Sequence, residues 1–450
     1  MIRLGTVADD LTGATTAAAL FARSGISAIA YWDLDAAENA KNSDADAVLL
    51  STGSRAMKPE EAYETVSRAT RILRDIGAPQ YQKRIDTTLR GGIGAEIDAM
   101  LDVLGDDYLA VVVPSMPQNH RIVIGGYSLI DGDLLSRTEV RNDARTPVHE
   151  SFIPRLLSAQ TRRPVKQLTA ESLALGKEAI AMRLKTLYNQ GVRVIVADAV
   201  SMDDIRLIAD ACQESGLKVL SVDPGPFTAC LAGEAKPDHA VETVRKEEAC
   251  GTVLVAVGST TEHSRRQIDI LCADPQTERV VLHPECFLTN GPDCAAEIDR
   301  AVNEVRPLLL RKNAPQAVVL DASSEAALFG QREERLRDKA HDKNGKDPVG
   351  DCLGQILHRL LSENEVLQRV CGLYLTGGDT MAAILARLEV DCVRVHDYIV
   401  PQVDLCHLVG GQLDGMIVVS KGGLTGDDQI GIRIVQKILQ EAAREGLSFR

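Results

Sequence analysis

The sequence lacks several features that would place it in a common class at once. No uninterrupted apolar stretch reaches about 18 residues, so we expect no transmembrane helix and no membrane partner. Residues 1–10 hold one basic residue and a short apolar run that ends in two aspartates, which is unlike a signal peptide. The first of the ten cysteines is Cys212, and none belongs to a C-x-x-C pair. We therefore expect free thiols in a cytoplasmic protein rather than disulfides or structural zinc.

Basic residues are also outnumbered. The chain has 50 Lys and Arg against 64 Asp and Glu, a formal net charge of −14. A general nucleic-acid binder needs a basic surface for phosphates, so no nucleic-acid partner is expected. A local basic site for one small anion is compatible with this balance. The content of 45% hydrophobic and 25% charged residues is typical of soluble globular proteins, and 450 residues suggest two or three domains.

Four common catalytic or binding motifs are missing. The sequence has no G-x-x-x-x-G-K-[ST] P-loop, no complete G-x-G-x-x-G fingerprint, no H-E-x-x-H and no G-x-S-x-G. The nine histidines are scattered without metal-ligand spacing, so they identify no metal site. A bound nucleotide would have to be held by backbone amides and helix dipoles.

Short runs rich in Val, Ile and Leu alternate with longer helical patterns. Continuous apolar runs predict strands buried on both faces. Residues 59–76 predict a helix, because Pro59 suits a first turn and apolar residues such as Val66 and Leu73 follow at helical spacing. The pattern predicts an α/β fold with helices on both faces of open parallel or mixed sheets. The predicted strands include residues 2–7, 47–50, 110–113, 192–197, 218–222, 252–257, 316–320, 372–375 and 415–419.

The best domain boundary lies between Gly233 and Gly251. That stretch contains a proline and a charged run but no convincing apolar strand, and a fresh strand begins directly after it. We predict two domains, residues 1–235 and 250–450, each with a mostly parallel or mixed sheet flanked by helices. A polar stretch at residues 331–350 predicts a surface excursion within the second domain.

Polar residues gather at the predicted strand ends, which is where open α/β sheets bind ligands. The strand at residues 2–7 is followed by Asp9 and Asp10 and then by a helix start. Two adjacent carboxylates suit a substrate hydroxyl, a metal or a partner arginine. The simpler alternative is that one of them only caps the helix.

A denser cluster lies at residues 83–94. Its charged and hydroxyl side chains precede a glycine-rich turn whose N–H groups suit an anion, and arginine can grip a carboxylate with two parallel hydrogen bonds. An ordinary polar turn with surface salt bridges is the alternative. Together with Arg55 and Arg121, which follow other strands, the cluster predicts a locally basic site for a polyhydroxylated acid. Its side chains are Lys83, Arg84, Asp86, Thr87, Thr88 and Arg90.

The second half carries glycine-rich loops after three predicted strands. Glycines permit close approach by a phosphate chain and helix N-termini favour negative charge, so the three loops together suggest a nucleotide. A single Gly-Gly-Asp-Thr is more often only a turn and a helix cap. The loops contain Gly258, Ser259, Gly377, Gly378, Asp379, Thr380, Lys421, Gly422 and Gly423.

These motifs resemble the four-carbon acid sugar kinase family. The resemblance rests on Ala-Asp-Asp-Leu-Thr-Gly-Ala at 8–14, Asp-Thr-Thr-Leu-Arg-Gly at 86–91 and Thr-Gly-Gly-Asp-Thr at 376–380, and it covers essentially the whole chain. It implies an N-terminal acid-sugar domain and a C-terminal ATP domain. The implied reaction is ATP-dependent phosphorylation of the terminal 4-hydroxyl of D-threonate, D-erythronate or 3-oxo-tetronate, with ATP and Mg²⁺ as cofactors. A homodimer is common for such architectures.

The resemblance also implies a role for each site residue. Asp9 and Asp10 would meet substrate hydroxyls, and one of them, with Asp10 the first choice, would accept the 4-hydroxyl proton. The residues implied around the acid sugar are Asp9, Arg55, Lys83, Asp86, Thr87, Thr88, Arg90 and Arg121. Those implied around ATP are Ser259, Gly377, Gly378, Asp379, Thr380, Gly422 and Gly423.

The resulting hypothesis is phosphoryl transfer, which needs positioning and charge neutralisation more than covalent chemistry. A basic cluster that includes Lys83 and Arg90 would hold the carboxylate, so that the far end of the acid points at the γ-phosphate. Asp379 would contact magnesium or the nucleotide, or would only cap its own helix. Two alternatives stay open: a kinase of another small hydroxy acid, and a non-catalytic protein that senses a nucleotide or metabolite.

Overall fold

The computed structural model describes residues 2–143, 145–233, 251–259, 261–287, 291–323, 347–423 and 425–446. The chain divides into two compact units, Met1–His239 and Ala240–Arg450. The predicted boundary stretch between Gly233 and Gly251 and most of the predicted excursion at 331–350 lie outside the described residues.

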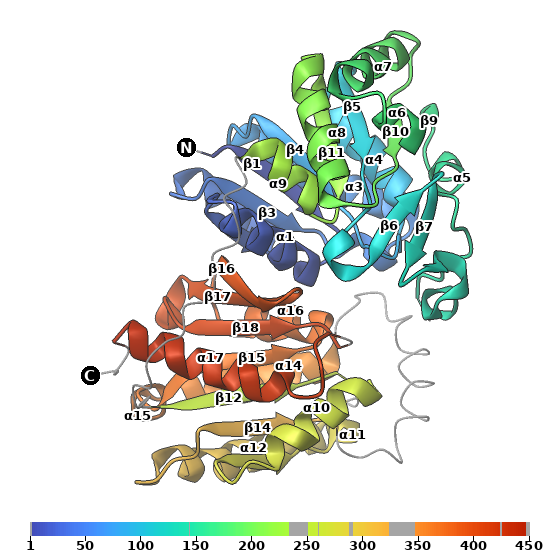
Figure 1. Cartoon of the computed structure of the whole chain (residues 1–450). Helices are drawn as coiled ribbons and strands as arrows, with labels where there is room; N and C mark the ends of the chain where they lie inside the picture. Colours follow the sequence, from blue (N-terminus) through green and yellow to red (C-terminus); the bar gives the residue numbers. More distant parts are fainter. Residues whose placement is uncertain are drawn as a thin grey trace. The chain divides into compact units, whose positions relative to one another are not determined.

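The first unit is a parallel sheet with helices on both faces (Figure 1). Its strand order is β2-β3-β1-β4-β11-β5-β10-β9, and neighbouring strands pair in parallel. Helices α1, α7, α8 and α9 cover one face, and α3 and α4 cover the other. The strands are β1 (Leu4–Ala8), β2 (Ala28–Tyr31), β3 (Ala47–Ser51), β4 (Gln80–Arg84), β5 (Tyr108–Val112), β9 (Val165–Leu168), β10 (Val194–Ala197) and β11 (Lys218–Asp223). The helices are α1 (Leu11–Arg23), α2 (Leu34–Ala37), α3 (Pro59–Asp75), α4 (Ile93–Leu104), α5 (Ile153–Ser158), α6 (Ala170–Leu173), α7 (Lys177–Asn189), α8 (Met202–Ser215) and α9 (Pro226–Ala232).

Apolar sequence explains most of these elements. Strands β1, β3 and β10 are buried along their whole length, as continuous apolar runs predict. Helix α3 starts with Pro59 in its first turn and buries Val66 and Leu73, as their spacing predicts. Gly77, at φ +87°, follows the helix in a conformation that favours glycine.

A small antiparallel sheet follows β5 and consists of β6 (Arg121–Ile124), β7 (Tyr127–Ile130) and β8 (Asp133–Leu134). Asp198, a buried carboxylate after β10, holds its first turn. The Asp198 oxygens accept hydrogen bonds from the backbone N–H groups of Gly125 at 2.9 Å, Gly126 at 2.8 Å and Ala170 at 3.0 Å. A buried carboxylate needs such donors to offset its lost hydration. Asp198 therefore ties this hairpin, which carries Arg121, to the main sheet.

The second unit is a mixed sheet in the order β13-β14-β12-β15-β18-β17-β16. Pairing is parallel from β13 to β18 and antiparallel for β17 and β16. Helices α10 and α17 cover one face, and α12, α14 and α16 cover the other. The strands are β12 (Thr252–Val257), β13 (Thr277–Val281), β14 (Ala317–Asp321), β15 (Val370–Thr376), β16 (Cys392–Val400), β17 (Val403–Val409) and β18 (Ile417–Lys421). The helices are α10 (Glu262–Cys272), α11 (Pro284–Phe287), α12 (Pro292–Leu310), α14 (Pro348–Leu361), α15 (Asn364–Leu367), α16 (Gly378–Arg387) and α17 (Ile430–Arg444).

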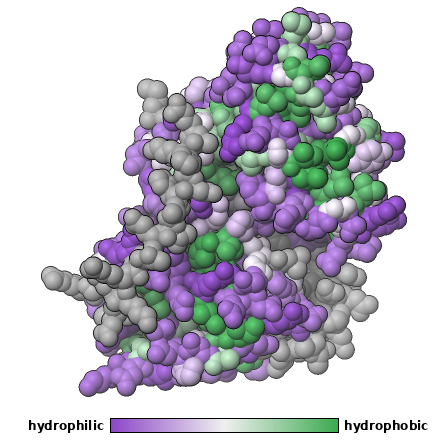
Figure 2. All heavy atoms as spheres, viewed as in Figure 1, coloured by the Kyte–Doolittle hydropathy of each residue, from purple (hydrophilic) through white to green (hydrophobic). Residues whose placement is uncertain are grey.

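One parallel and one mixed sheet confirm the predicted α/β class. In the described residues, no helix has both the length and the apolar character needed to cross a membrane. The cysteines in these residues are free thiols, as predicted. Hydrophilic side chains dominate the face shown in Figure 2, in keeping with the charged composition.

Candidate functional site

The carboxyl ends of β1, β3 and β4 lie side by side in the first unit. Ala8, at the end of β1, pairs with Ser51 of β3 on one side and with Arg84 of β4 on the other. The residues that follow β1 and β3 therefore meet the end of β4 at one edge of the sheet. This edge is where open α/β sheets bind their ligands.

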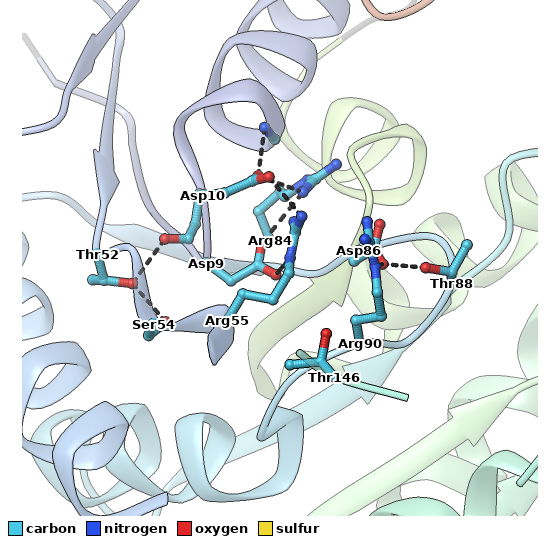
Figure 3. A network of polar contacts seen from close by, with 12 residues as sticks. Asp9, Asp10, Thr52, Ser54, Arg55, Arg84, Asp86, Thr88, Arg90 and Thr146 are labelled. Carbon is cyan, nitrogen blue, oxygen red and sulfur yellow. Dashed lines mark hydrogen bonds and ion pairs between the residues drawn. The ribbon is translucent and has the colours of Figure 1, made fainter. Parts of the chain in front are cut away.

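Two arginines join Asp9 and Asp10 at this edge (Figure 3). Arg55 Nε lies 2.7 Å from Asp9 Oδ2, and its Nη1 lies 2.7 Å from Asp10 Oδ2. Arg84 Nη1 lies 3.3 Å from Asp9 Oδ1 and 3.3 Å from Asp10 Oδ1. Asp10 also caps α1, because its Oδ1 accepts the Gly13 N–H at 2.7 Å. The arginine partnership and the helix cap, two of the alternatives open from the sequence, thus occur together.

Burial separates the two aspartates. The Asp9 side chain is 4% exposed and that of Asp10 is 25% exposed. Burial alone would raise the pKa of Asp9, but Arg55, Lys83 and Arg84 lower it to about 2. Asp9 is therefore ionised at neutral pH and anchors the arginines within the fold. Asp10 is the member of the pair with surface that a ligand hydroxyl can reach.

A second carboxylate, Asp86, follows β4 and orients Arg90. Arg90 Nε lies 2.7 Å from Asp86 Oδ2, and its Nη1 lies 3.1 Å from Asp143 Oδ2. The Thr88 hydroxyl also donates to Asp86 (Figure 3). Burial would raise the pKa of Asp86, but Arg55 and Arg90 hold it far below its usual range. Asp86 is therefore a fixed anion that aims the Arg90 guanidinium.

Arg121 reaches the same group of loops from the hairpin. Its Nε donates to Thr87 Oγ1 at 3.0 Å, and its Nη1 donates to the Asn119 carbonyl at 2.8 Å. The structure thus links Thr87, Thr88 and Arg90 with Arg121 through one loop after β4. Their predicted roles toward a substrate stay predictions.

Lys83 is a predicted substrate contact that is fully buried in the structure. It lies within β4 rather than in a turn, and its side chain is 0% exposed. Its Nζ lies 2.6 Å from Glu96 Oε2 of α4 and donates to the Arg84 carbonyl at 2.9 Å. Because the Lys83 ammonium has no exposed surface, a bound acid could not contact it in this structure. Lys83 lowers the pKa of Asp9 from inside the fold, and its predicted contact with the acid sugar stays a prediction.

The sequence placed Arg84 in the basic cluster but gave it no individual role, although it contacts both aspartates. The missing step was the recognition of residues 80–84 as a strand. Successive side chains of a strand point to opposite faces, so Arg84 must point away from Lys83. Lys83 meets Glu96 on α4, and Arg84 therefore meets Asp9 and Asp10 on the other side.

Gly13 makes room for Arg84, which gives a testable expectation. A Cβ at Gly13 would overlap Arg84 Nη1 and Cζ and lie 2.5 Å from Asp10 Oδ1, so Gly13→Ala must shift the guanidinium or the Asp10 carboxylate and separate the two. Because hydrogen bonds to charged groups contribute about 1.5–3 kcal/mol, we expect kcat/KM for the acid sugar that the family resemblance implies to fall roughly 10- to 100-fold. Alanine itself favours a helix, but Arg84 is buried and ion-paired, so the unfolding midpoint should fall as well. An unchanged kcat/KM would show that activity does not depend on the contact of Arg84 with Asp9 and Asp10.

The glycine loops of the second unit also share one sheet edge. Strands β12, β15 and β18 are neighbours, since Val257 pairs with Thr376 and Thr376 pairs with Lys421. Ser259 and Gly423 follow the outer two of these strands. The Gly423 carbonyl accepts hydrogen bonds from Thr261 Oγ1 and Ser264 Oγ, each at 2.8 Å, which ties its loop to the start of α10.

The loop after β15 packs tightly at the start of α16. Gly377 has φ +107°, a conformation that favours glycine, and a Cβ at Gly258 would overlap the Thr380 hydroxyl. That hydroxyl donates to Asp347 Oδ2 at 2.8 Å, so Asp347 is a neighbour that the sequence did not identify. Gly378 is the first residue of α16. The side chain of Asp379 lies outside the described residues, and its predicted contacts stay predictions.

Family models match both halves of the chain. One described as a sugar-binding N-terminal domain matches residues 4–231, and one described as a nucleotide-binding C-terminal domain matches residues 254–430. A D-erythronate kinase of Heliobacterium modesticaldum is 34% identical over 448 residues, which cover 98% of this chain and 98% of the relative. The chain belongs to the four-carbon acid sugar kinase family. The aspartate–arginine edge lies in the segment matched by the sugar-binding model, and the glycine loops lie in that matched by the nucleotide-binding model.

Other members of the acid sugar kinase family are similar over most of their length. A D-threonate kinase of Salmonella typhimurium is 28% identical, covering 94% of this chain and 95% of its own. A 3-oxo-tetronate kinase of Pseudomonas savastanoi is 28% identical and covers 91% of each.

Two solved structures share the fold. A putative tRNA synthase of Salmonella typhimurium has a TM-score of 0.76 at 19% identity and covers 97% of this chain and 100% of its own. A Haemophilus influenzae protein has a TM-score of 0.71 at 21% identity and covers 99% and 100%. At these identities the two structures support the fold alone.

Proposed function

We propose that the protein is an ATP-dependent kinase of a four-carbon acid sugar, D-threonate, D-erythronate or 3-oxo-tetronate, that phosphorylates the terminal 4-hydroxyl. The observation that carries the proposal is the accessible Asp10 carboxylate held by Arg55 and Arg84 at the sugar-binding edge. The relatives named as kinases of these three acids support it.

In the proposed reaction, the 4-hydroxyl oxygen attacks the γ-phosphorus of ATP, its proton passes to Asp10 Oδ2 or Oδ1, and ADP leaves. Arg55 and Arg84 hold the Asp10 carboxylate in one orientation. Arg90 and Arg121 are the proposed partners of the substrate carboxylate, because planar guanidinium groups match carboxylates and both side chains are partly exposed.

The proposed ATP contacts are backbone groups of the three glycine loops. Helix α16 begins at Gly378, and the free N–H groups of its first turn suit a phosphate. The full proposed set is Ser259, Gly377, Gly378, Asp379, Thr380, Gly422 and Gly423.

The described residues contain no preformed magnesium site made of protein side chains. No group of three or more His, Cys, Asp or Glu side chains there could hold a metal ion. Mg²⁺ often keeps most of its waters and binds through substrate phosphates. We therefore propose that it enters bound to ATP, and no step here depends on a protein ligand for it.

The test is ATP turnover, coupled to ADP detection, with D-threonate, D-erythronate, L-threonate, 3-oxo-tetronates, and three- and five-carbon hydroxy acids. We expect the highest kcat/KM with a four-carbon acid and a product phosphorylated at the 4-oxygen. Higher kcat/KM with another chain length would favour a kinase of a different hydroxy acid. Binding of ATP and a tetronate without phosphorylated product would favour a sensing protein.

A further inference from the structure

Lys421 is a buried cation at the nucleotide edge to which the proposed reaction gives no role. It is the last residue of β18 and is 2% exposed. Burial is the one cause that shifts its pKa, and no carboxylate in the described residues offsets that burial. A buried ammonium without a counter-ion is costly, and this one lies next to loops matched to nucleotide binding.

Hydrogen bonds from Lys421 shape the glycine loop. Its Nζ donates to the Gly422 carbonyl at 2.8 Å and to Ser264 Oγ at 3.4 Å. Ser264 Oγ in turn donates to the Gly423 carbonyl. In a trans peptide the C=O of one residue and the N–H of the next point in opposite directions. Drawing the Gly422 carbonyl toward Lys421 therefore turns the Gly423 N–H away from it, and carbonyl oxygens that would repel a phosphate are held inward.

Thr376 adds a second buried polar group beside Lys421. The two residues are directly paired across β15 and β18, so their side chains project to the same face of the sheet. Thr376 is 0% exposed, and its Oγ1 has no hydrogen-bond partner in the described residues. Unused hydrogen-bonding capacity in the interior indicates a missing polar partner. Both groups lie at the end of the sheet where the glycine loops begin.

We propose that Lys421 is a positioning residue for the phosphate chain of the nucleotide: it presents the Gly423 amide to the anion and supplies the buried positive charge of the loop. The proposal rests on the proposed nucleotide-dependent function of this site. It adds a residue that acts through the loop rather than one that touches the reacting atoms.

Titration of Lys421 gives a signature that a purely structural lysine would not have. Burial lowers its pKa from 10.5 to about 8. Bound phosphates favour the charged form and raise that pKa, so binding near pH 8.5 should draw a proton from solution. Ionisable groups on the elements around Lys421 include Glu262, His263, Arg265 and Arg266 on α10, Tyr374 on β15, Asp404 on β17, and Asp427 and Asp428 before α17, but burial alone shifts the Lys421 pKa.

The test is calorimetric titration of the full-length protein with ATP at pH 8.5 in two buffers of different ionisation enthalpy, which gives the protons taken up. We expect a fractional proton uptake by wild type and none by Lys421→Met, whose dissociation constant rises roughly 10- to 100-fold. Lys421→Arg should keep most of the affinity but show no uptake, since arginine is always protonated. The matched control is Lys437→Met on α17, which removes a lysine paired with Glu441 and should behave as wild type.

Wild-type protein that binds ATP without proton uptake overturns the proposal, even where Lys421→Met does not fold. Equal uptake by wild type and Lys421→Met overturns it as well. If ATP binds with proton uptake that depends on Lys421 but no acid is phosphorylated, the kinase proposal is wrong and the Lys421 proposal stands.

Discussion

Asp10→Asn is expected to lower kcat for the acid sugar by about 10²- to 10⁴-fold, the range for loss of a general base, with a much smaller change in KM. Asparagine has the same shape and caps helices as well as aspartate, so the Gly13 N–H keeps its acceptor and the fold is retained. The coupled assay gives kcat and KM, and thermal unfolding reports the fold. Full activity in Asp10→Asn would remove Asp10 as the base.

Two variants separate the base from its surroundings. Asp33→Asn is the matched control, because Asp33 caps α2 in the same unit through the Asp35 N–H and should leave kcat unchanged. Asp9→Asn should act differently, since Asp9 is buried between Arg55 and Arg84. We expect it to lower the unfolding midpoint more than Asp10→Asn does. A loss of kcat confined to Asp9→Asn would reverse the assignment of the two aspartates.

Lys83→Met should cost about 3–5 kcal/mol of stability, because it leaves the Glu96 carboxylate buried without its partner. For a unit of this size, that loss corresponds to a fall of roughly 6–20 °C in Tm. Breaking one side of a buried pair is more harmful than replacing both partners with apolar side chains of similar volume. Lys83→Met with Glu96→Leu should therefore recover much of the lost Tm.

The control for Lys83 is another lysine–carboxylate pair in the same unit. Lys218 Nζ lies 2.5 Å from Asp107 Oδ2, but both side chains are more than half exposed to solvent. Exposed pairs are screened by water and salt, so Lys218→Met should leave Tm nearly unchanged. A similar Tm for Lys83→Met and Lys218→Met in thermal unfolding would contradict the importance of the buried pair.

Strands made of apolar residues could be predicted from the sequence, whereas β4 could not. Its sequence is Gln-Tyr-Gln-Lys-Arg, yet Gln82, Lys83 and Arg84 are buried. The Gln82 amide donates to Asp223 Oδ1 at 2.8 Å, and Lys83 pairs with Glu96. Each polar group is stable inside because of a partner elsewhere in the chain. Hydrophobic periodicity carries no information about such partners.

In the candidate site, too, some residues could be predicted from the sequence and others could not. The strand-end rule placed Asp9, Asp10 and Arg55 at one edge, because β1 and β3 are both apolar and parallel. Lys83 and Arg84 could not be told apart without the strand assignment, since their side chains point to opposite faces. Asp347, the partner of Thr380, caps α14 and has no motif of its own.

The Asp198 anchor has a consequence for protein engineering. The hairpin that carries Arg121 is bound to Asp198 through the backbone N–H groups of Gly125 and Gly126, so this part of its attachment does not depend on the hairpin's side chains. Residues 117–134 can then be treated as a segment to exchange for the equivalent hairpin of a relative, as long as both glycines, Asp198, the buried Val123 and Arg121 are kept. Substrate preference could be redesigned in this way while the apolar strands of the parallel sheet stay untouched.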